Sequence, residues 1–289
     1  MMRKLHVFLF LIGFVLTSTT FAQSQKGDIN NDGIIKVLAI GNSFSEDALD
    51  NYLTELAIAT NKKLVIGDLY IGGAPLDLHL KNLIADASAY RYIKIDEKAK
   101  KEVRKDVSIA QAIADDNWDY ISFQQASPLS GQYEVIQASL PQVVQYVREL
   151  AGADVVFVYH QTWAYQHDSD HGGFANYNRD QKQMYKAIAD ATKRIHKSRD
   201  FKFIIPAGTA IQNARTSSIG DTYTRDGYHL HLDYGRFTAA CTWYEKLFGE
   251  DVRKNPYKPE QVTDLQAKIA KEAAHKAIKK PFKVSKVAL

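Results

Sequence analysis

The sequence predicts an α/β protein, built as a three-layer α/β/α sandwich around a five-stranded parallel sheet with an inserted β-hairpin. Two observations predict this class. Short apolar runs alternate along the chain with longer segments that have the apolar spacing of helices, an order typical of parallel sheets covered by helices on both faces. The first run, residues 35–40, is almost wholly apolar, as in a strand buried on both sides.

The expected elements follow one another in a regular order. Strands are expected at residues 35–40, 64–71, 120–123, 155–159 and 203–205, and helices at residues 49–60, 109–115, 141–150, 179–195 and 234–248. Residues 90–106 interrupt this order, and the alternation in residues 90–95 predicts the hairpin there. This order of strands and helices predicts a flavodoxin-like sheet, in which functional groups gather beyond the carboxyl ends of the strands.

The N-terminus has the pattern of a secretory signal peptide. Arg3 and Lys4 precede an apolar run at residues 7–16, and Ala22 is a small residue suited to cleavage. The run is about half the roughly 20 residues that a membrane-spanning helix needs. We therefore expect residues 1–22 to be removed, leaving a secreted or periplasmic protein with no membrane span. Its single cysteine, Cys241, leaves no intrachain disulfide to stabilise it.

The mature chain divides into three expected parts. Residues 23–35 form a polar segment, residues 36–250 the α/β domain, and residues 251–289 a basic helix and tail that we expect to be solvated. The polar segment begins like a calcium loop at Asp28, but the twelfth position is Ala39 instead of an acid. The formal net charge of +4 gives no reason to expect a nucleic-acid partner.

Two short motifs at opposite ends of the domain have the residue types of a serine hydrolase. G-N-S-F-S at residues 41–45 follows the first strand, and D-G-Y-H at residues 226–229 precedes the last helix. A serine hydroxyl becomes a nucleophile when a histidine accepts its proton, and an aspartate can orient that histidine. Ser43, His229 and Asp226 are therefore the expected nucleophile, base and orienting acid.

Each of these residues also has an ordinary structural alternative. Ser43 could cap a helix, as Ser45 could, because serine is strongly preferred at that position. Asp226 could support a turn, since Asp-Gly is a common turn dipeptide. His231 is a competing base. The catalytic interpretation depends on several strand ends meeting at one edge of the sheet.

In these motifs and their order, the chain resembles the SGNH, or GDSL-type, hydrolases. Asn42 stands where the first block of that family usually has aspartate, Gly72-Gly73 stands at the second block, and residues 226–229 match the fifth. W-D-Y at 118–120, Q-Q-A-S at 124–127 and H-Q-T-W at 160–163 are also similar to an exported bacterial subfamily of unknown function. The resemblance implies cofactor-free hydrolysis of an acyl ester through a seryl ester.

The third block departs from the family pattern. Where the family has an asparagine that donates to the oxyanion, this chain has Gln124 and Gln125. A glutamine offers the same donor one methylene further out, and Gln125 is the preferred candidate. Alternatively, the backbone amides of Ser43 and Gly73 are the only donors to the oxyanion. Losing one such donor costs about 2.7–4 kcal/mol of transition-state stabilisation, which changes the rate more than the reaction.

The substrate is less defined by the sequence. Trp163, among amide and aromatic neighbours, could hold a sugar ring or could be a core residue. An exported enzyme of this type is expected to remove O-acetyl or related acyl groups from a small molecule or a glycan. Arg215 and Arg225 could hold an acidic sugar or a phosphate, or could form surface ion pairs.

Two other classes of function remain open. The first is a metal-dependent hydrolase whose ligands would be His160, His167, Asp168, Asp170 and His171. Their spacing is irregular compared with known ligand patterns, so no metal is expected. The second is a glycan-binding module that keeps the fold without catalysis, since fold does not establish function. The sequence does not predict the oligomeric state.

Overall fold

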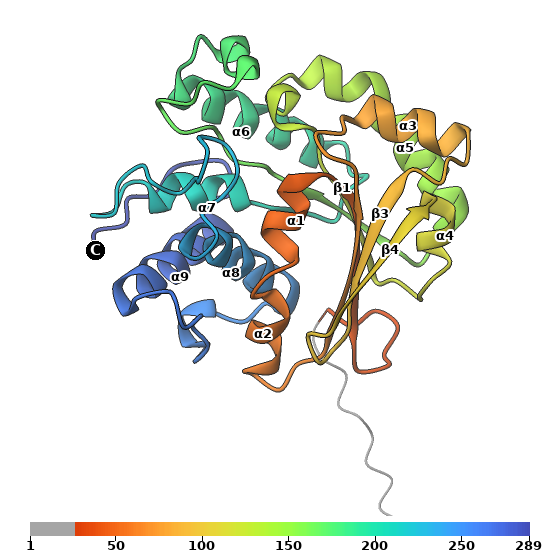
Figure 1. The fold of residues 1–289 in the computed structure, drawn as a ribbon, viewed down its shortest axis with the longest axis horizontal. Helices are drawn as coiled ribbons and strands as arrows, with labels where there is room; N and C mark the ends of the chain where they lie inside the picture. The colour runs from red at the N-terminus through yellow and green to blue at the C-terminus, as the bar shows by residue number, and fades with distance from the viewer. Residues whose placement is uncertain (1–26) are drawn as a thin grey trace, which may run out of the picture.

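The structure, a computed structural model, describes residues 27–289. The predicted signal peptide lies outside the described residues. At the centre is a seven-stranded sheet of order β4-β3-β2-β1-β5-β6-β7 (Figure 1). The strands are β1 (Ile35–Gly41), β2 (Leu64–Tyr70), β3 (Tyr90–Ile95), β4 (Lys101–Val107), β5 (Tyr120–Phe123), β6 (Val156–His160) and β7 (Phe203–Ile205).

The five-stranded parallel sheet is confirmed. β2, β1, β5, β6 and β7 pair in parallel, and every residue of β1 except Lys36 is buried, as a strand between two helical layers requires. The predicted hairpin is also present as β3 and β4. It does not stand apart, because β3 pairs antiparallel with β2 and extends the sheet.

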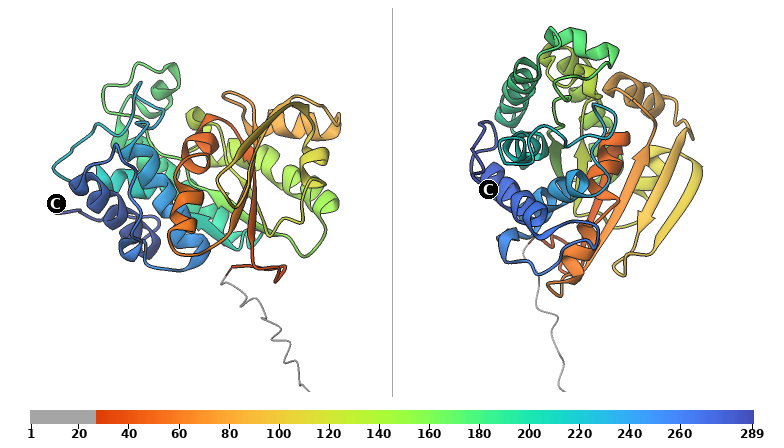
Figure 2. Two further views of the ribbon diagram at one scale, coloured as in Figure 1. Left: turned by 60° about the horizontal axis from the view of Figure 1, so that its bottom comes forward. Right: turned by 60° about the vertical axis from the view of Figure 1, so that its left-hand side comes forward.

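Helices cover both faces of the sheet, as Figures 1 and 2 show. One face carries α3, α4 and α5, and the other carries α1, α2, α7 and α8, with α9 packed on α7 and α8. The helices are α1 (Ser43–Leu49), α2 (Leu53–Ile58), α3 (Leu76–Ile84), α4 (Ile109–Ile113), α5 (Tyr133–Ala151), α6 (Gln181–Lys197), α7 (Ala207–Ala214), α8 (Tyr234–Phe248) and α9 (Asp264–Lys279).

The first helical segment differs from the prediction in a way that matters for the site. Residues 49–60 were expected to form one helix, but the structure has two short helices, α1 and α2. The break lies at Tyr52, whose φ of 68° is left-handed and cannot continue an α-helix. The first helix begins earlier than expected, at Ser43, directly after β1.

The C-terminal part belongs to the same core as the rest of the domain. The expectation of a solvated basic helix is wrong for one face of α9, where Ala270, Ala273 and Ala274 are buried. The chain then returns across the molecule, and the amide of Ser218 donates to the Leu289 carbonyl over 2.9 Å. Small residues make up most of this buried stripe, while Lys268 and Lys279 stay exposed on the other side of the helix.

The polar N-terminal segment is also tied to the domain. The buried Asp119 carboxylate accepts hydrogen bonds from the amides of Ile29 (2.8 Å), Asn30 (3.0 Å) and Lys36 (2.8 Å). Asp28 accepts from the Gly33 amide over 2.7 Å, so the segment that resembled a calcium loop forms a polar turn stabilised by its own aspartate.

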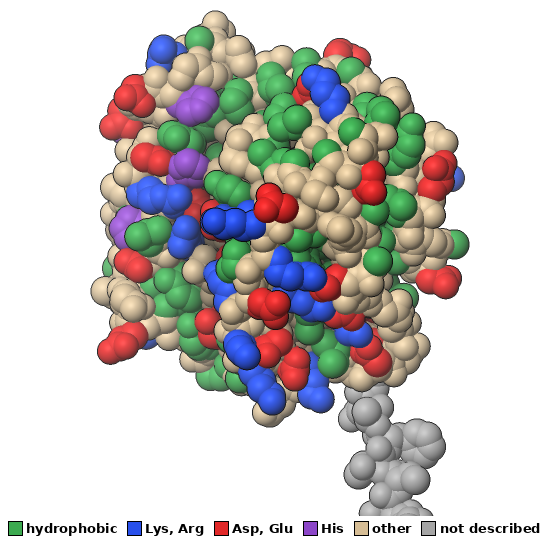
Figure 3. Space-filling view, turned by 45° about the vertical axis from the view of Figure 1, so that its right-hand side comes forward, with side chains coloured by type: hydrophobic (Ala, Val, Ile, Leu, Met, Phe, Trp, Pro, Cys, Tyr) green, Lys and Arg blue, Asp and Glu red, His purple; other side chains and the backbone are tan. Residues whose placement is uncertain are grey.

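The free edge of the sheet is charged. β4 is the outer strand, and its side chains are exposed from Lys101 to Asp106, a composition that discourages pairing with another chain. Figure 3 shows acidic and basic side chains interleaved over the lower part of the face that it presents. Among residues 27–289, no helix combines the length and apolar character needed to cross a membrane.

Candidate active site

Ser43, His229 and Asp226 form a continuous chain of hydrogen bonds. His229 Nε2 lies 2.8 Å from Ser43 Oγ, and His229 Nδ1 lies 2.6 Å from Asp226 Oδ2. A carboxylate can only accept, so Nδ1 carries a hydrogen and Nε2 of a neutral ring is free to accept the serine proton. The structure therefore brings together the three residues that the motifs predicted, in the order that nucleophilic catalysis requires.

Ser43 owes its position to the tight turn between β1 and α1. Asn42 is the N-cap of α1, and its side-chain oxygen accepts from the Phe44 amide over 3.0 Å. Neither Ser43 nor Ser45 serves as the cap, which was the structural alternative. Gly41 is required before the turn, since a Cβ there would lie 2.4 Å from Ser45 Oγ. Ser43 is the first residue of the helix and points out of the turn toward His229.

Asp226 holds its own loop as well as the histidine. Its Oδ1 accepts from the amides of His229 (2.7 Å) and Tyr228 (3.2 Å), while Oδ2 accepts from the His229 ring. Partial burial favours the neutral acid, but these hydrogen bonds outweigh it and lower the pKa of the Asp226 carboxyl. Asp226 is thus held as a carboxylate that can stabilise an imidazolium.

A buried aspartate on α1 fixes this loop to the helix that carries Ser43. The Asp47 carboxylate accepts from the Leu230 amide over 2.8 Å, from Arg225 Nη1 over 3.1 Å and from Arg236 Nε over 2.8 Å. Arg225 and Leu230 flank residues 226–229. Asp47 was not among the predicted site residues, although its place one helical turn after Ser43 puts both on the same side of α1.

A cavity of about 400 Å³ opens beside Ser43. Among the residues that line it are Asn42, Ser43, Phe44, Tyr70, Gly72, Gly73, Ser127, Pro128, His171, Tyr228 and His229. Gly73 has a φ of 66° and open space at the position of a Cβ, so its backbone faces the cavity without a side chain. The Ser43 amide is among the first N–H groups of α1, which have no acceptor within a helix.

The two glutamines after β5 lie under the site and do not line the cavity. Gln124 Nε2 donates to Asn42 Oδ1 over 2.8 Å, and Gln124 Oε1 lies 2.7 Å from His160 Nδ1. Gln125 Oε1 accepts from the amides of Leu76 (3.0 Å) and Ala126 (2.8 Å). Through these bonds both side chains support the backbone around the cavity. The role of Gln125 as a donor to the oxyanion, which would use its Nε2, stays a prediction.

Trp163 and the two arginines do not face the cavity either. Trp163 is fully buried, stacks on Phe44 with ring centroids 4.3 Å apart and donates to the Tyr228 carbonyl over 2.8 Å. Of the two roles considered for it, Trp163 therefore has that of a core residue. It packs behind the residues that form the wall of the cavity. Arg215 pairs with Asp221 over 2.6 Å, and Arg225 pairs with Asp47, so neither is available for an anionic substrate.

The histidines proposed as metal ligands do not converge. His160 is buried against Gln124, whereas His167 is exposed and pairs with Asp221 over 2.7 Å. His171 accepts from the Gly173 amide over 3.0 Å. His231 is no rival base for Ser43, since its ring stacks on Tyr234 with centroids 4.1 Å apart.

Within residues 27–289, one cluster of His, Asp and Glu side chains has the spacing of potential metal ligands. Glu245, Asp251 and His275 have potential ligand atoms within 4.8 Å of one another. Their contacts are structural, because Glu245 accepts from His275 Nδ1 (2.8 Å) and the Val252 amide (3.0 Å), and Asp251 pairs with Arg253 (2.7 Å). The cluster joins α8 to α9.

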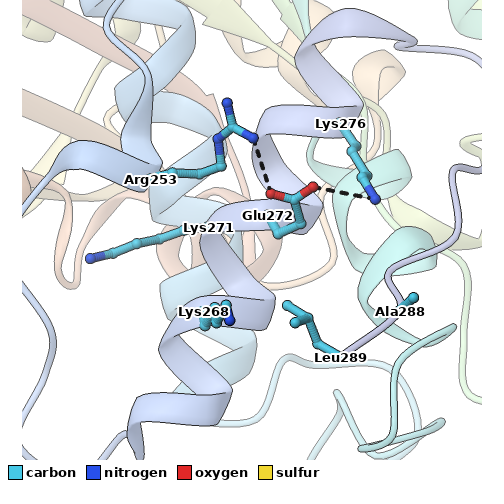
Figure 4. A pocket seen from close by; sticks show the side chains of 7 residues that line it. All are labelled: Arg253, Lys268, Lys271, Glu272, Lys276, Ala288 and Leu289. Atoms are coloured by element: carbon cyan, nitrogen blue, oxygen red, sulfur yellow. Dashed lines mark hydrogen bonds and ion pairs between the residues drawn. The ribbon is translucent and has the colours of Figure 1, made fainter.

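A second cavity, of about 340 Å³, lies beside α9 and shares no lining residue with the first. Figure 4 shows its charged side chains. Glu272 pairs with Arg253 and with Lys276, each over 3.3 Å, and Lys271 donates to the Asn255 carbonyl over 2.6 Å. The charges of Arg253, Glu272, Lys276 and Lys271 thus already have partners, and none of the lining residues named for this cavity is a nucleophile with a base beside it.

Comparisons with known proteins agree with this architecture. A crystal structure of a DUF4886 family protein from Bacteroides uniformis is 50% identical, with a TM-score of 0.86, over 88% of this chain and 98% of that chain. A candidate SGNH hydrolase from Slackia heliotrinireducens is 19% identical, with a TM-score of 0.48, over 73% of this chain and 98% of that chain. This sequence identity and this TM-score are too low to bear on activity.

A gut microbial diltiazem-metabolizing enzyme is similarly remote, at 16% identity and a TM-score of 0.45, over 74% of this chain and 47% of that chain. No curated protein matches. The family model for DUF4886, a domain of unknown function, matches residues 36–277. This match extends beyond the predicted boundary at residue 250 into α9, in agreement with the packing of that helix. The chain belongs to the DUF4886 family.

Proposed function

We propose that this protein is a serine hydrolase that cleaves carboxylic esters, with Ser43 as nucleophile, His229 as general base and Asp226 as the residue that orients it. The observation that carries the proposal is the unbroken chain from Ser43 Oγ through His229 to Asp226, with links of 2.8 and 2.6 Å. This chain opens onto a cavity large enough for a small ester.

The proposed reaction has two balanced steps. Ser43 Oγ attacks the ester carbonyl as His229 Nε2 takes its proton, and the tetrahedral oxyanion accepts hydrogen bonds from the Ser43 and Gly73 amides. The C–O bond then breaks, and His229 returns the proton to the departing alcohol. Water attacks the seryl ester in the same way, giving the carboxylic acid and free Ser43.

The lining of the cavity favours an uncharged substrate. Its known lining residues include no lysine or arginine, and Asp226 adds a negative charge next to His229. Together with the secretory pattern of residues 1–22, this lining supports an exported esterase acting on an acyl group, such as an O-acetyl group, of a neutral carbohydrate or a similar polyhydroxylated alcohol.

Hydrolysis of a chromogenic acetyl ester by the mature protein tests the proposal. Ser43→Ala should lower kcat by a factor on the order of 10⁴ or more, because the covalent step is lost, while the melting temperature stays unchanged. Ser45→Ala, the second serine of the same motif, is the matched control and should remain active.

An equal rate for Ser43→Ala and the wild type would overturn the assignment of the nucleophile. The alternative of a glycan-binding module predicts something different: no turnover of any ester, together with glycan binding that Ser43→Ala leaves unchanged.

A further inference from the structure

His171 lies in the wall of the cavity that Ser43 and His229 also line. It comes from the loop between β6 and α6, which no part of the proposed reaction uses. Its ring centroid is 4.7 Å from that of Tyr228, which in turn is 4.1 Å from that of His229. Tyr228 therefore contacts both histidine rings, and His171 lines the cavity without belonging to the hydrogen-bonded chain of Ser43, His229 and Asp226.

The hydrogen bonds of His171 determine its tautomer. Its Nδ1 accepts from the Gly173 amide over 3.0 Å, as the N-cap of the short 3₁₀ helix Gly172–Tyr177. A backbone amide can only donate, so Nδ1 carries no hydrogen and Nε2 is an N–H donor. Burial, and then the nearby His229, lower the pKa of His171, which keeps this tautomer neutral.

The other side-chain nitrogens known to line the cavity are already engaged. The Asn42 amide donates to the Ala74 carbonyl over 3.0 Å, and His229 is committed to Ser43 and Asp226. The Ser127 hydroxyl, on the same wall, is 2.8 Å from the Tyr165 hydroxyl. His171 Nε2 is thus the imidazole or amide donor that this lining leaves available to a ligand.

We propose that His171 binds the substrate, by donating its Nε2–H to an oxygen in the alcohol part of the ester, away from the scissile carbonyl. This inference rests on the proposed function and narrows its substrate to esters with such a second oxygen. A hydroxyl, a ring oxygen or a further acyl oxygen of a sugar would meet this requirement, whereas a simple aryl ester would not.

Two substitutions distinguish a role of His171 in binding the substrate from a role in supporting its own loop. In His171→Asn, the side-chain oxygen can replace Nδ1 as the cap of Gly173, but the distal donor is lost. In His171→Gln, the side-chain amide reaches the position of Nε2, but the cap is lost. His167→Asn is a matched control four residues earlier, since His167 is exposed and does not line the cavity.

The experiment compares phenyl acetate with an acetylated methyl glucoside. We expect His171→Asn to raise KM for the glucoside roughly three- to tenfold, as for the loss of one neutral hydrogen bond. Its kcat/KM for phenyl acetate should stay within about twofold of the wild type. His171→Gln should approach the wild type on both substrates, and His167→Asn should match it.

Equal losses for His171→Asn and His171→Gln on both substrates, with lower melting temperatures, would show that His171 only supports its loop and would overturn the inference. An unchanged KM of His171→Asn for the glucoside would also overturn it. If the wild type hydrolysed neither ester, the proposed function itself would fail, and that outcome is distinct from the other two.

Discussion

At the scale of single residues, the side chains of Asn42, Gln124 and His160 form a hydrogen-bond network beneath Ser43. In each of its bonds, the donor and the acceptor can be assigned in only one way. The Ala74 carbonyl can only accept, so the Asn42 amide nitrogen faces it, and Asn42 Oδ1 must then accept from Phe44 and Gln124. Gln124 Oε1 in turn accepts from His160 Nδ1, and burial lowers the pKa of His160 to about 3. The network holds the Gly73–Ala74 backbone at a fixed place relative to Ser43.

Gln124→Glu should break this network. A carboxylate oxygen would face Asn42 Oδ1, so two buried acceptors would meet without a proton between them. We expect the free energy of unfolding to fall by about 1–3 kcal/mol, the usual cost of an unsatisfied buried group, and kcat/KM to fall with it. Denaturant titration and ester hydrolysis measure both. Gln142→Glu, an exposed site on α5, is the control; equal behaviour of the two variants would contradict this account.

The candidate residues were predictable from the sequence to different degrees. Ser43, Asp226 and His229 lie in two short motifs whose spacing follows from local turns, so they could be named directly. The roles of Gln124, Gln125 and Trp163 could not, because their partners come from strands and loops far along the chain. Asn42 directs Gln124 away from the cavity, and Phe44 and Tyr228 enclose Trp163.

At the scale of elements, the site depends on how the loop at residues 226–229 is held against α1. Asp47 makes that connection through Arg225, Arg236 and the Leu230 amide. The aspartate is fully buried, and a buried charge that loses its partner is expensive. The loop, and with it His229, should therefore lose its position when this carboxylate is removed.

Asp47→Ala should lower stability by about 3–5 kcal/mol, because it leaves two arginines unpaired, and should lower kcat more than it raises KM. Glu46→Gln is the matched control on the same helix, since Glu46 pairs with Arg91 in a partly exposed ion pair (2.6 Å) that is expected to contribute little. Thermal melts and steady-state kinetics compare them. A stable and active Asp47→Ala enzyme would exclude this role.

The sequence predicted strands better than helices. The five parallel strands begin and end within two residues of the prediction, because each is a short and mostly apolar run. α7 was not predicted; it is short, and it buries the polar residues Thr209, Gln212 and Asn213 together with its apolar ones. α5 begins at Tyr133, earlier than expected, with Pro141 inside it, whereas a proline is more usual in the first turn of a helix.

At the scale of the whole molecule, the parallel strands bring the site together. Paired residues such as Gly41 with Tyr70, Phe123 with Tyr159, and His160 with Ile205 place the strand ends at one edge. The three-layer class was predictable because it follows from the order of elements. The addition of β3 and β4 to the sheet and the burial of α9 were not, since both depend on contacts between distant segments.

The molecule also contains a pair of buried acids behind α1, which should affect its stability as the pH changes. Burial raises the pKa of Asp50 to about 7, although Lys101 lies 3.5 Å away and opposes the shift. Asp68 is fully buried, and burial together with Asp50 raises its pKa as well. The folded state thus holds protons that the unfolded chain has already released.

It follows that the contribution of Asp50 to stability should fall as the pH rises from about 4 to about 7. Asp50→Asn removes part of this dependence, so it should melt at a higher temperature than the wild type at pH 8 and at a similar temperature near pH 4. Asp190→Asn, at an exposed site, is the control. A pH profile of melting temperatures checks this, and parallel curves for Asp50→Asn and the wild type would contradict it.

The most direct test of the central claim is to label the mature protein with a serine-reactive fluorophosphonate and to identify the modified peptide by mass spectrometry. The account predicts one adduct, on Ser43, that disappears in Ser43→Ala and is much reduced in His229→Ala. An adduct on another residue, or labelling of Ser43→Ala at the wild-type rate, would show that Ser43 is not the nucleophile.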